Sequence, residues 1–155
     1  MKYLFAFLVY LLITSKTNGQ DLLCYSKEQI YIWYAEEYSD DTTFVYNISE
    51  NDSCVVVKIT GIEFIQIEYF LDENDLCKKV ILYYSCGPCY SKHKSDLFAE
   101  RKLKWRKIED NFYLSSWSWK RTLRIEDMTN GEFCGKVVYE HINSRSEYKR
   151  IKNLV

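Results

Sequence analysis

Seven short segments with the residue pattern of β-strands dominate the chain after residue 29: most show alternation along the chain, and 80–85 is a continuous apolar run. A period of two places successive side chains on opposite faces of an extended strand. β-branched and aromatic residues fill these segments, and clusters of Asp, Asn, Ser and Gly separate most of them. Short strands at roughly even spacing are typical of an antiparallel sandwich or barrel. The predicted strands are 30–35, 44–49, 54–60, 64–71, 80–85, 114–119 and 133–142.

The composition agrees with one all-β domain. The 155 residues are 47% apolar and 17% aromatic, but they include only five glycines and one proline. This apolar fraction is ordinary for a folded domain, and the shortage of glycine excludes the phosphate-binding loops of nucleotide-binding folds. Residues 91–111 are the exception to the strand pattern, and we predict a loop or a short irregular helix there. No internal repeat is evident.

The first nineteen residues have the layout of a signal peptide. Lys2 precedes an apolar run over 3–13, and small polar residues follow up to Gly19. The run is too short to span a bilayer, so we predict cleavage after Gly19 rather than a membrane anchor. No later segment is long and apolar. The expected product is a single secreted domain over 20–155 with no membrane span.

Glycosylation and cysteine signals agree with secretion. Two Asn-x-Ser sequons predict surface glycans on Asn47 and Asn51. An even number of cysteines in an oxidising compartment predicts disulfides, although the sequence does not choose among the possible pairings. The cysteines are Cys24, Cys54, Cys77, Cys86, Cys89 and Cys134.

Charge is divided along the chain. The formal net charge is only -1, which argues against a nucleic-acid partner, as does secretion. Residues 20–91 hold thirteen acids and four bases (net -9), whereas residues 92–124 hold ten bases and four acids (net +6). The basic segment is either an ordinary solvated surface or the rim of a site for an anionic ligand.

The segment from Cys86 to Cys89 reads Cys-Gly-Pro-Cys, the motif of thiol oxidoreductases of the thioredoxin type. That fold also needs a cis-proline facing the motif and alternating strands and helices, yet Pro88 is the only proline and the chain is mostly strands. We therefore favour structural cysteines and keep the oxidoreductase as a lesser alternative. Only His93 and His141 are available as histidine ligands, so we predict no enzyme, no metal site and no cofactor.

Several short motifs follow one another in a recognisable order. They are Cys24, residues 44–48 ahead of Cys54, the hairpin over 61–85, the aromatic-Ser-aromatic-Lys run over 117–120 and the Gly-x-aromatic run within 130–133. Their order and spacing resemble the MD-2-related lipid-recognition (ML) family, and within it the myeloid differentiation co-receptors of Toll-like receptors (the lymphocyte antigen 96 and 86 type).

The resemblance implies an immunoglobulin-like two-sheet β-sandwich, a cup whose sheets part around a hydrophobic cavity. It also implies a Cys24–Cys54 disulfide and leaves the pairing of the other four cysteines open. Two cysteines that tie the second strand to the last one in the co-receptors are absent here, and the segment between Trp119 and Gly131 is longer.

Alternation nominates a set of side chains to line the cavity, although plain core packing would produce the same pattern. Basic residues near the predicted mouth are candidates for binding a lipid headgroup, and Met128 stands where the co-receptors carry a gating aromatic. The cavity set is Tyr46, Ile48, Ile65, Ile67, Tyr69, Ile81, Tyr83, Trp117, Trp119, Phe133, Val137 and Tyr139. The headgroup set is Lys120, Arg121, Arg124 and Met128.

With the secretion signals, the resemblance implies a secreted co-receptor in innate immunity and the inflammatory response. It would hold the acyl chains of an anionic glycolipid, such as a lipopolysaccharide, and present it to a Toll-like receptor ectodomain of the Toll-like receptor 4 type. Each buried CH₂ contributes about 0.8 kcal/mol, so capture needs no catalytic group. The alternative is a lipocalin-like carrier of a small hydrophobic ligand, although the Gly-x-Trp start of lipocalins is missing.

Overall fold

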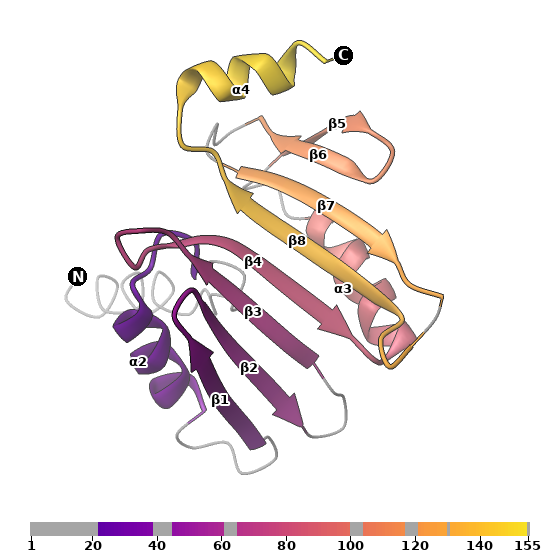
Figure 1. Ribbon diagram of the computed structural model, residues 1–155. Helices are drawn as coiled ribbons and strands as arrows, with labels where there is room; N and C mark the ends of the chain where they lie inside the picture. Colours follow the sequence, from indigo (N-terminus) through magenta and orange to yellow (C-terminus); the bar gives the residue numbers. More distant parts are fainter. Residues whose placement is uncertain are drawn as a thin grey trace, which may run out of the picture.

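The computed structural model describes residues 22–38, 45–60, 65–99, 104–116, 121–129 and 131–154. Its strands form one antiparallel sheet of eight, ordered β1-β2-β3-β4-β8-β7-β6-β5 (Figure 1). The elements are α2 (Lys27–Glu37), β1 (Val45–Asn51), β2 (Cys54–Thr60), β3 (Ile65–Leu71), β4 (Cys77–Tyr84), α3 (Gly87–Ala99), β5 (Trp105–Glu109), β6 (Phe112–Ser115), β7 (Arg121–Asp127), β8 (Gly135–His141) and α4 (Arg145–Lys152).

The fold repeats one topological unit. Each half consists of a helix followed by four antiparallel strands, and the last strands of the two halves, β4 and β8, pair at the centre of the sheet. The sequence showed no repeat because the two halves share this order of elements without sharing an evident residue pattern. The repeat leaves β1 and β5 as the two edges of the sheet.

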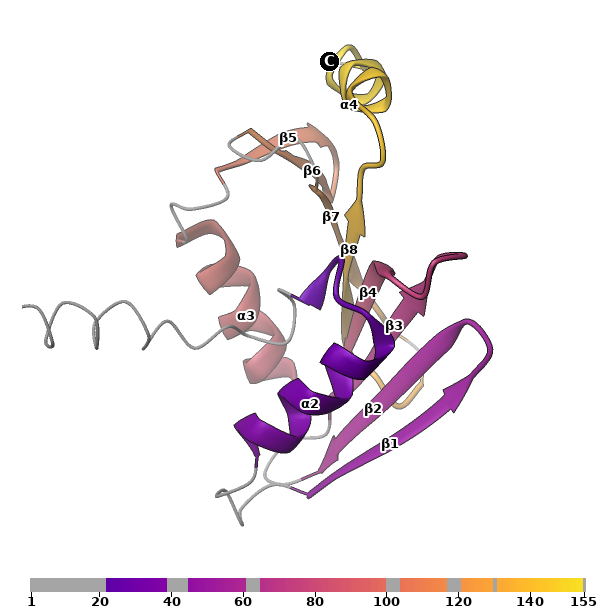
Figure 2. The same cartoon turned by 90° about the vertical axis from the view of Figure 1, so that its left-hand side faces the viewer.

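The two faces of the sheet are covered differently. Helices α2 and α3 lie on the same face (Figure 2), and their buried side chains join the main core. One row of that core crosses six strands through the paired residues Ile48, Val57, Ile67, Leu82, Val137 and Ile125. On the opposite face, Tyr148 and Ile151 of α4 pack on a smaller cluster formed by Ile108, Leu114 and Ile142.

The prediction of a mostly β, antiparallel domain is confirmed. Five predicted strands coincide with β1, β2, β3, β4 and β8 to within a few residues, and the segment 114–119 overlaps the end of β6. The division into two facing sheets is not confirmed, because all eight described strands belong to one sheet. Helices form the second layer on the face where a second sheet was expected.

The predicted strand over 30–35 is wrong, because this segment belongs to helix α2. A capping box starts the helix: the Ser26 hydroxyl accepts from the Gln29 backbone N–H at 3.3 Å, and Gln29 Oε1 accepts from the Ser26 N–H at 2.9 Å. Ile30 and Tyr34, four residues apart, both point into the core and are fully buried. Ile32 lies on the outer side and stays 55% exposed.

Helix α3 is longer and more regular than the loop or irregular helix that we predicted for 91–111. It runs for thirteen residues and begins inside the Cys-Gly-Pro-Cys motif. Only Tyr90 and Leu97 of this helix are buried, and they stand two turns apart on one side. A single narrow line of contact fastens this polar helix to the sheet, which explains why no clear apolar stripe marked it in the sequence.

Gly135 at the start of β8 is required by the close approach of α3. A Cβ atom at this position would overlap the ring of Tyr90, which is buried and packs on Tyr84 with ring centroids 5.7 Å apart. We expect Gly135→Ala to lower the free energy of unfolding by about 2 kcal/mol, because the ring has no room to withdraw. Denaturant titration measures this change.

Gly87→Ala is the matched control, because a methyl group added at this position would have no atom within 4 Å. We expect its unfolding midpoint to stay close to that of the parent protein. Equal stability of the two variants would show that α3 does not press against β8 as described.

Candidate functional site

An incompletely buried aromatic cluster lies between α3 and the neighbouring edge of the sheet. Phe98 of α3 is 49% exposed, and its ring centroid lies 5.0 Å from that of Tyr113 in β6. Trp105 in β5 and Tyr113 are half-buried and pack at the margin of the main core. We call Phe98, Trp105 and Tyr113 the α3 aromatic site. Large aromatic surfaces left partly open to solvent are typical of ligand-binding sites.

Strand register places the two sheet residues of this site on one face. Trp105 pairs with Ser115, whereas Tyr113 pairs with Lys107 and with Leu123. Residues two apart share a face, so Trp105 and Tyr113 are diagonal neighbours on the side that carries α3. Leu123 and Ser115 beneath them are fully buried. The site therefore has a rigid base in the sheet and one wall formed by the helix.

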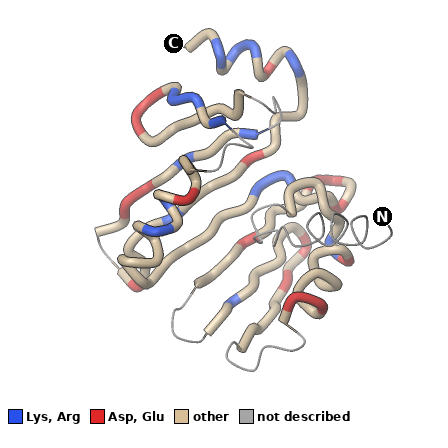
Figure 3. The backbone as a smooth tube through the Cα atoms, turned by 180° about the vertical axis from the view of Figure 1, so that it is seen from behind, with Lys and Arg blue, Asp and Glu red and all other residues tan. Residues whose placement is uncertain are grey.

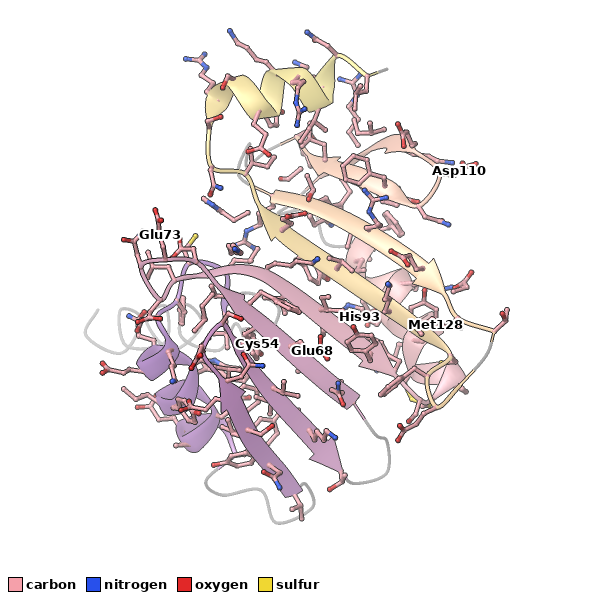
Figure 4. The ribbon with its side chains drawn as sticks, viewed as in Figure 1. Cys54, Glu68, Glu73, His93, Asp110 and Met128 are labelled. Atoms are coloured by element: carbon pink, nitrogen blue, oxygen red, sulfur yellow. A yellow bond between two sulfur atoms is a disulfide. The ribbon has the colours of Figure 1, made fainter. Side chains whose placement is uncertain are left out.

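The floor of the site consists of two polar rings, of which Tyr139 is buried and His93 is half-buried. Tyr139 of β8, only 1% exposed, lies 6.4 Å from Trp105 between ring centroids, and its hydroxyl lies 3.3 Å from Nε2 of His93. His93 belongs to α3, on the far side of the sheet in Figure 4, and its ring stacks on Tyr84 at 5.4 Å. Burial lowers the pKa of His93 to about 4, although Asp96 opposes this shift. The floor is therefore uncharged at neutral pH.

Trp105 contributes an unused hydrogen-bond donor. Its indole Nε1 is buried and has no hydrogen-bond partner among the described residues. Buried indole N–H groups normally have an acceptor, and an unmade bond costs about 1–3 kcal/mol. A ligand carbonyl, carboxylate or phosphate oxygen is the kind of group that this donor would bind.

Arg121 lies in the same row of the sheet as Trp105. It opens β7 on the face of Leu123, and the register places it one strand beyond Ser115, the partner of Trp105. The side chain is half-buried. Of the four predicted headgroup residues, this one is brought to the aromatic site, and it adds a cation to the site.

The other headgroup residues are not gathered there. Arg124 lies on the opposite face, where its guanidinium stacks over Phe112 at 4.7 Å from the ring centroid. Met128 follows β7 and its N–H donates to the Cys134 carbonyl at 2.9 Å, within the connection to β8. Lys120 lies outside the described residues. The prediction erred for Arg124 because three residues along a strand reverse the face.

The twelve predicted cavity residues divide into three groups. Ile81, Tyr83 and Phe133 lie on the opposite face. Leu82 of β4 points toward the helices, so its neighbours Ile81 and Tyr83 point away from them. The Phe133 ring packs on that of Tyr83, with 5.2 Å between ring centroids. The continuous apolar run of β4 has no alternation from which its inner face could be read. Trp117 and Trp119 lie outside the described residues. The helix-side group is Tyr46, Ile48, Ile65, Ile67, Tyr69, Val137 and Tyr139.

Most of the helix-side group packs into a filled core. Tyr69 is fully buried, and its hydroxyl shares a 2.7 Å hydrogen bond with that of Tyr34 from α2. The rings of Tyr34, Tyr38 and Tyr46 pack together at 5.7–5.9 Å between centroids. The cavity expected between two sheets is not confirmed, and α2 fills the space against these strands. Tyr139 alone joins the α3 aromatic site.

Phe98, Trp105 and Tyr113 were not among the predicted site residues. Phe98 and Trp105 stood in a segment that fitted no helical stripe, and strands β5 and β7 were not predicted at all. The only sequence signal near them was the basic charge of 92–124. Figure 3 shows the Lys and Arg residues in the described parts of this segment in the half of the molecule remote from α2, with more on α4.

A second chemically distinctive site lies at the start of α3. Cys86, which immediately precedes the helix, forms a disulfide with Cys89 in its first turn. The Cys89 backbone N–H donates to the Cys86 sulfur at 3.3 Å. The other four cysteines are free thiols, so the predicted Cys24–Cys54 bond is not present in the structure.

Both predicted glycosylation sites are accessible. Asn47 is exposed on β1, the edge strand of the sheet, where it pairs with Lys58 of β2. Asn51 is exposed at the end of the same strand, and its Oδ1 accepts from the Ser53 backbone N–H at 3.1 Å. A glycan at either position would hinder the pairing of this edge with another chain.

Over the described ranges, no helix is long and apolar enough to cross a membrane. No cluster of three or more His, Cys, Asp or Glu side chains in the same part of the chain is arranged to hold a metal ion. Comparison of the chain with models of known protein families, with curated proteins and with solved structures finds no match.

The half-buried imidazole of His93 makes stability depend on pH. Its pKa is about 4 in the folded protein and about 6.5 when the chain unfolds, so the unfolded state binds more protons between these values. We expect the free energy of unfolding to fall by roughly 3 kcal/mol as the pH drops from above 6.5 to 4. Urea titrations across this range measure the slope.

His93→Gln is the control, because an amide can still reach the Tyr139 hydroxyl but does not titrate. Asp72 and Asp127, whose pKa values are lowered by hydrogen bonds, add their own loss only below about pH 4 in both proteins. A variant with the same slope as the parent between pH 6.5 and 4 would refute the assignment to His93.

Proposed function

We propose that this protein is a secreted, non-enzymatic binding protein for an anionic amphiphile. The apolar chain of the ligand lies against Phe98, Trp105 and Tyr113, and its acidic group lies near the Trp105 indole N–H and Arg121. The observation that carries this proposal is the buried indole donor without a partner, set beside two half-open aromatic rings.

The chemistry of the site fits such a ligand in three ways. The aromatic rings supply apolar surface, and the uncharged His93–Tyr139 floor does not penalise burial of an acyl chain. The free indole donor and the guanidinium provide polar anchors for a carboxylate or phosphate. Residues 92–124, which include the three residues of the α3 aromatic site, carry a net charge of +6 from ten bases and four acids.

The energetic scale is sufficient without catalysis. Each CH₂ removed from water contributes about 0.8 kcal/mol, so about six methylenes on this surface contribute roughly 5 kcal/mol. A charge-assisted hydrogen bond to the acidic group adds about 1.5–3 kcal/mol. Together these terms come to about 6.5–8 kcal/mol, which corresponds to a dissociation constant of roughly 1–20 μM before the entropy of association is subtracted.

The finer form of the proposal comes from the ML-family resemblance. In that form the ligand is a lipopolysaccharide-like glycolipid, and the protein presents it to a Toll-like receptor 4-type ectodomain. The lipocalin-like carrier would bind a hydrophobic ligand without a receptor, but it requires a closed barrel. The described strands give an open order with β1 and β5 at its ends.

A fluorescent fatty acid and its alcohol analogue test the site directly. We expect the glycosylated protein to bind the acid, and lipid A to displace it. Arg121→Gln should weaken binding of the acid about tenfold and leave the alcohol unchanged, because only the acid carries the charge. Phe98→Ser should weaken both probes. Titration by fluorescence gives the dissociation constant of each probe for the parent protein and for each variant.

Ile32→Ser is the matched control, because Ile32 is an equally exposed apolar side chain on the other helix of the same face. It should bind both probes like the parent. Absence of probe binding by the parent protein, or equal loss in the Ile32 variant, would reject the proposal. Binding of lipid without binding of the lipid-loaded protein to the receptor ectodomain would retain the carrier function and reject presentation.

A second candidate is thiol–disulfide exchange at Cys86 and Cys89. The favouring observation is that the bond forms at the start of a thirteen-residue helix that directly follows the central strand β4. A helix N-terminus stabilises a thiolate, and the Cys89 N–H adds a hydrogen bond to the Cys86 sulfur.

Equilibration with glutathione redox buffers decides this candidate. An exchange-active bond should be reduced at potentials near those of the glutathione pool, whereas a structural bond is reduced only at potentials below about −300 mV. Reduction of a disulfide substrate should disappear in Cys86→Ser and persist in Cys54→Ser. A bond that stays oxidised throughout the glutathione range excludes the oxidoreductase.

A further inference from the structure

The short segment before α2 is paired to the beginning of β4 at a point where two cysteines meet. The Cys24 backbone N–H donates to the Cys77 carbonyl at 2.7 Å, and the Cys77 N–H donates to the Tyr25 carbonyl at 2.8 Å. Ser26 and Leu76 form an antiparallel bridge beside them. The backbone around the two cysteines is therefore held from both sides.

We propose that Cys24 and Cys77 form a structural disulfide that fastens the N-terminal segment and helix α2 to the centre of the sheet. The 2.7 Å contact between the Cys24 nitrogen and the Cys77 oxygen, together with the covalent bonds on either side, keeps the two Cα atoms within about 6.6 Å, below the upper limit of about 6.8 Å for a disulfide. This bond would take the place of the Cys24–Cys54 bond implied by the family resemblance, and it is independent of the proposed ligand.

The face on which each sulfur lies excludes Cys54 as the partner of Cys77. Cys54 pairs with Phe70 and Cys77 pairs with Leu71, and these neighbouring residues of β3 point to opposite faces. Cys77 accordingly packs in the helix-side core with Leu71, whereas Cys54 is not part of that core (Figure 4 shows Cys54 at the start of β2).

The remaining cysteines lie at the other end of β4. Cys134 donates its N–H to the Tyr84 carbonyl at 2.7 Å, and Cys86 and Cys89 follow Tyr84 within five residues. The two halves of the fold can be compared position by position. Cys24 stands three residues before α2, and Tyr84 stands three residues before α3. Cys77 is the first residue of β4, and Cys134 immediately precedes β8. Only the first half has a cysteine at both equivalent positions.

The oxidation is balanced with a low-molecular-weight disulfide such as oxidised glutathione as the oxidant. The exposed Cys24 thiolate attacks one sulfur of that disulfide and releases one thiolate. The Cys77 thiol then gives its proton to the released thiolate, and the resulting Cys77 thiolate attacks the Cys24 sulfur. The second half of the oxidant leaves as a thiolate and takes up the proton that Cys24 lost before the first attack. Two protein thiols are oxidised and one disulfide is reduced to two thiols.

Burial makes the second step the slow one. The pKa of Cys77 is raised to about 12, chiefly by burial, so little thiolate is present at neutral pH. In folded, reduced protein we expect a mixed disulfide on Cys24 to accumulate before the internal bond closes. Closure should accelerate as the pH is raised from 7 to 9.

Tryptic peptide mapping of the secreted protein under non-reducing conditions tests the pairing. After cleavage at Lys and Arg, Cys24 lies in peptide 20–27, Cys54 in the sequon-bearing peptide 28–58 and Cys77 in peptide 59–78. We expect peptide 20–27 to be linked to 59–78, and 28–58 to carry a free thiol. A link from 20–27 to 28–58, or free thiols at both Cys24 and Cys77, would overturn the proposal.

Stability gives a second readout. The bond closes a loop from residue 24 to residue 77, and its loss should lower the melting temperature by about 10 °C. Cys24→Ser should show this loss under oxidising conditions and none in excess reductant, because the exposed Cys24 side chain adds little packing. Cys54→Ser is the control and should keep both the link and the dependence on reductant. A Cys24→Ser protein as stable as the parent when oxidised would contradict the bond.

Discussion

The pairing of β4 with β8 is the contact on which the rest of the fold depends. Each half of the chain supplies four strands and one covering helix, too little to bury its own apolar face. The register that joins Leu82 to Val137 continues one apolar row across both halves, so α2 and α3 cover a single core. Gly135 stands at the same junction and allows Tyr90 of α3 to lie directly on the sheet. Weaker pairing of β4 with β8 would therefore lower the stability of both halves together.

The alternation of apolar and polar residues was sufficient to predict the strands whose two faces differ in polarity. Segments around β1 and β3 alternate, and the helix-side residues Ile48 and Ile67 were assigned to the correct face. It failed for β4, whose apolar side chains lie on both faces because Ile81 is buried opposite Leu82. It also failed for α2, because apolar residues lie on the outside of this helix as well as the inside. Tyr25, Ile32 and Trp33, with Gln29 and Glu36, line an open groove of about 240 Å³ on its outer side.

The candidate site depends on long-range geometry that no local pattern contains. Phe98, Trp105 and Tyr113 come from three elements, and they meet only because β5 and β6 fold back along the sheet edge while α3 lies over the same face. Arg121 was predicted from charge alone, and the register then placed it in the row of Trp105. The net charge of a segment can be read directly from its sequence, whereas the aromatic cluster forms only when distant segments come together in the fold.

Stability and the proposed binding of a ligand are opposed at Trp105. A buried indole N–H without an acceptor costs about 1–3 kcal/mol, a substantial share of the stability of a small domain. Phenylalanine at this position would remove that cost and keep most of the packing. A donor held in an unfavourable state by its surroundings is typical of a preorganised binding site, because the ligand recovers the free energy that folding left unused. The same reasoning explains why His93 and Tyr139 satisfy each other beneath it: the floor is closed and neutral, so the indole N–H is the donor left for a ligand.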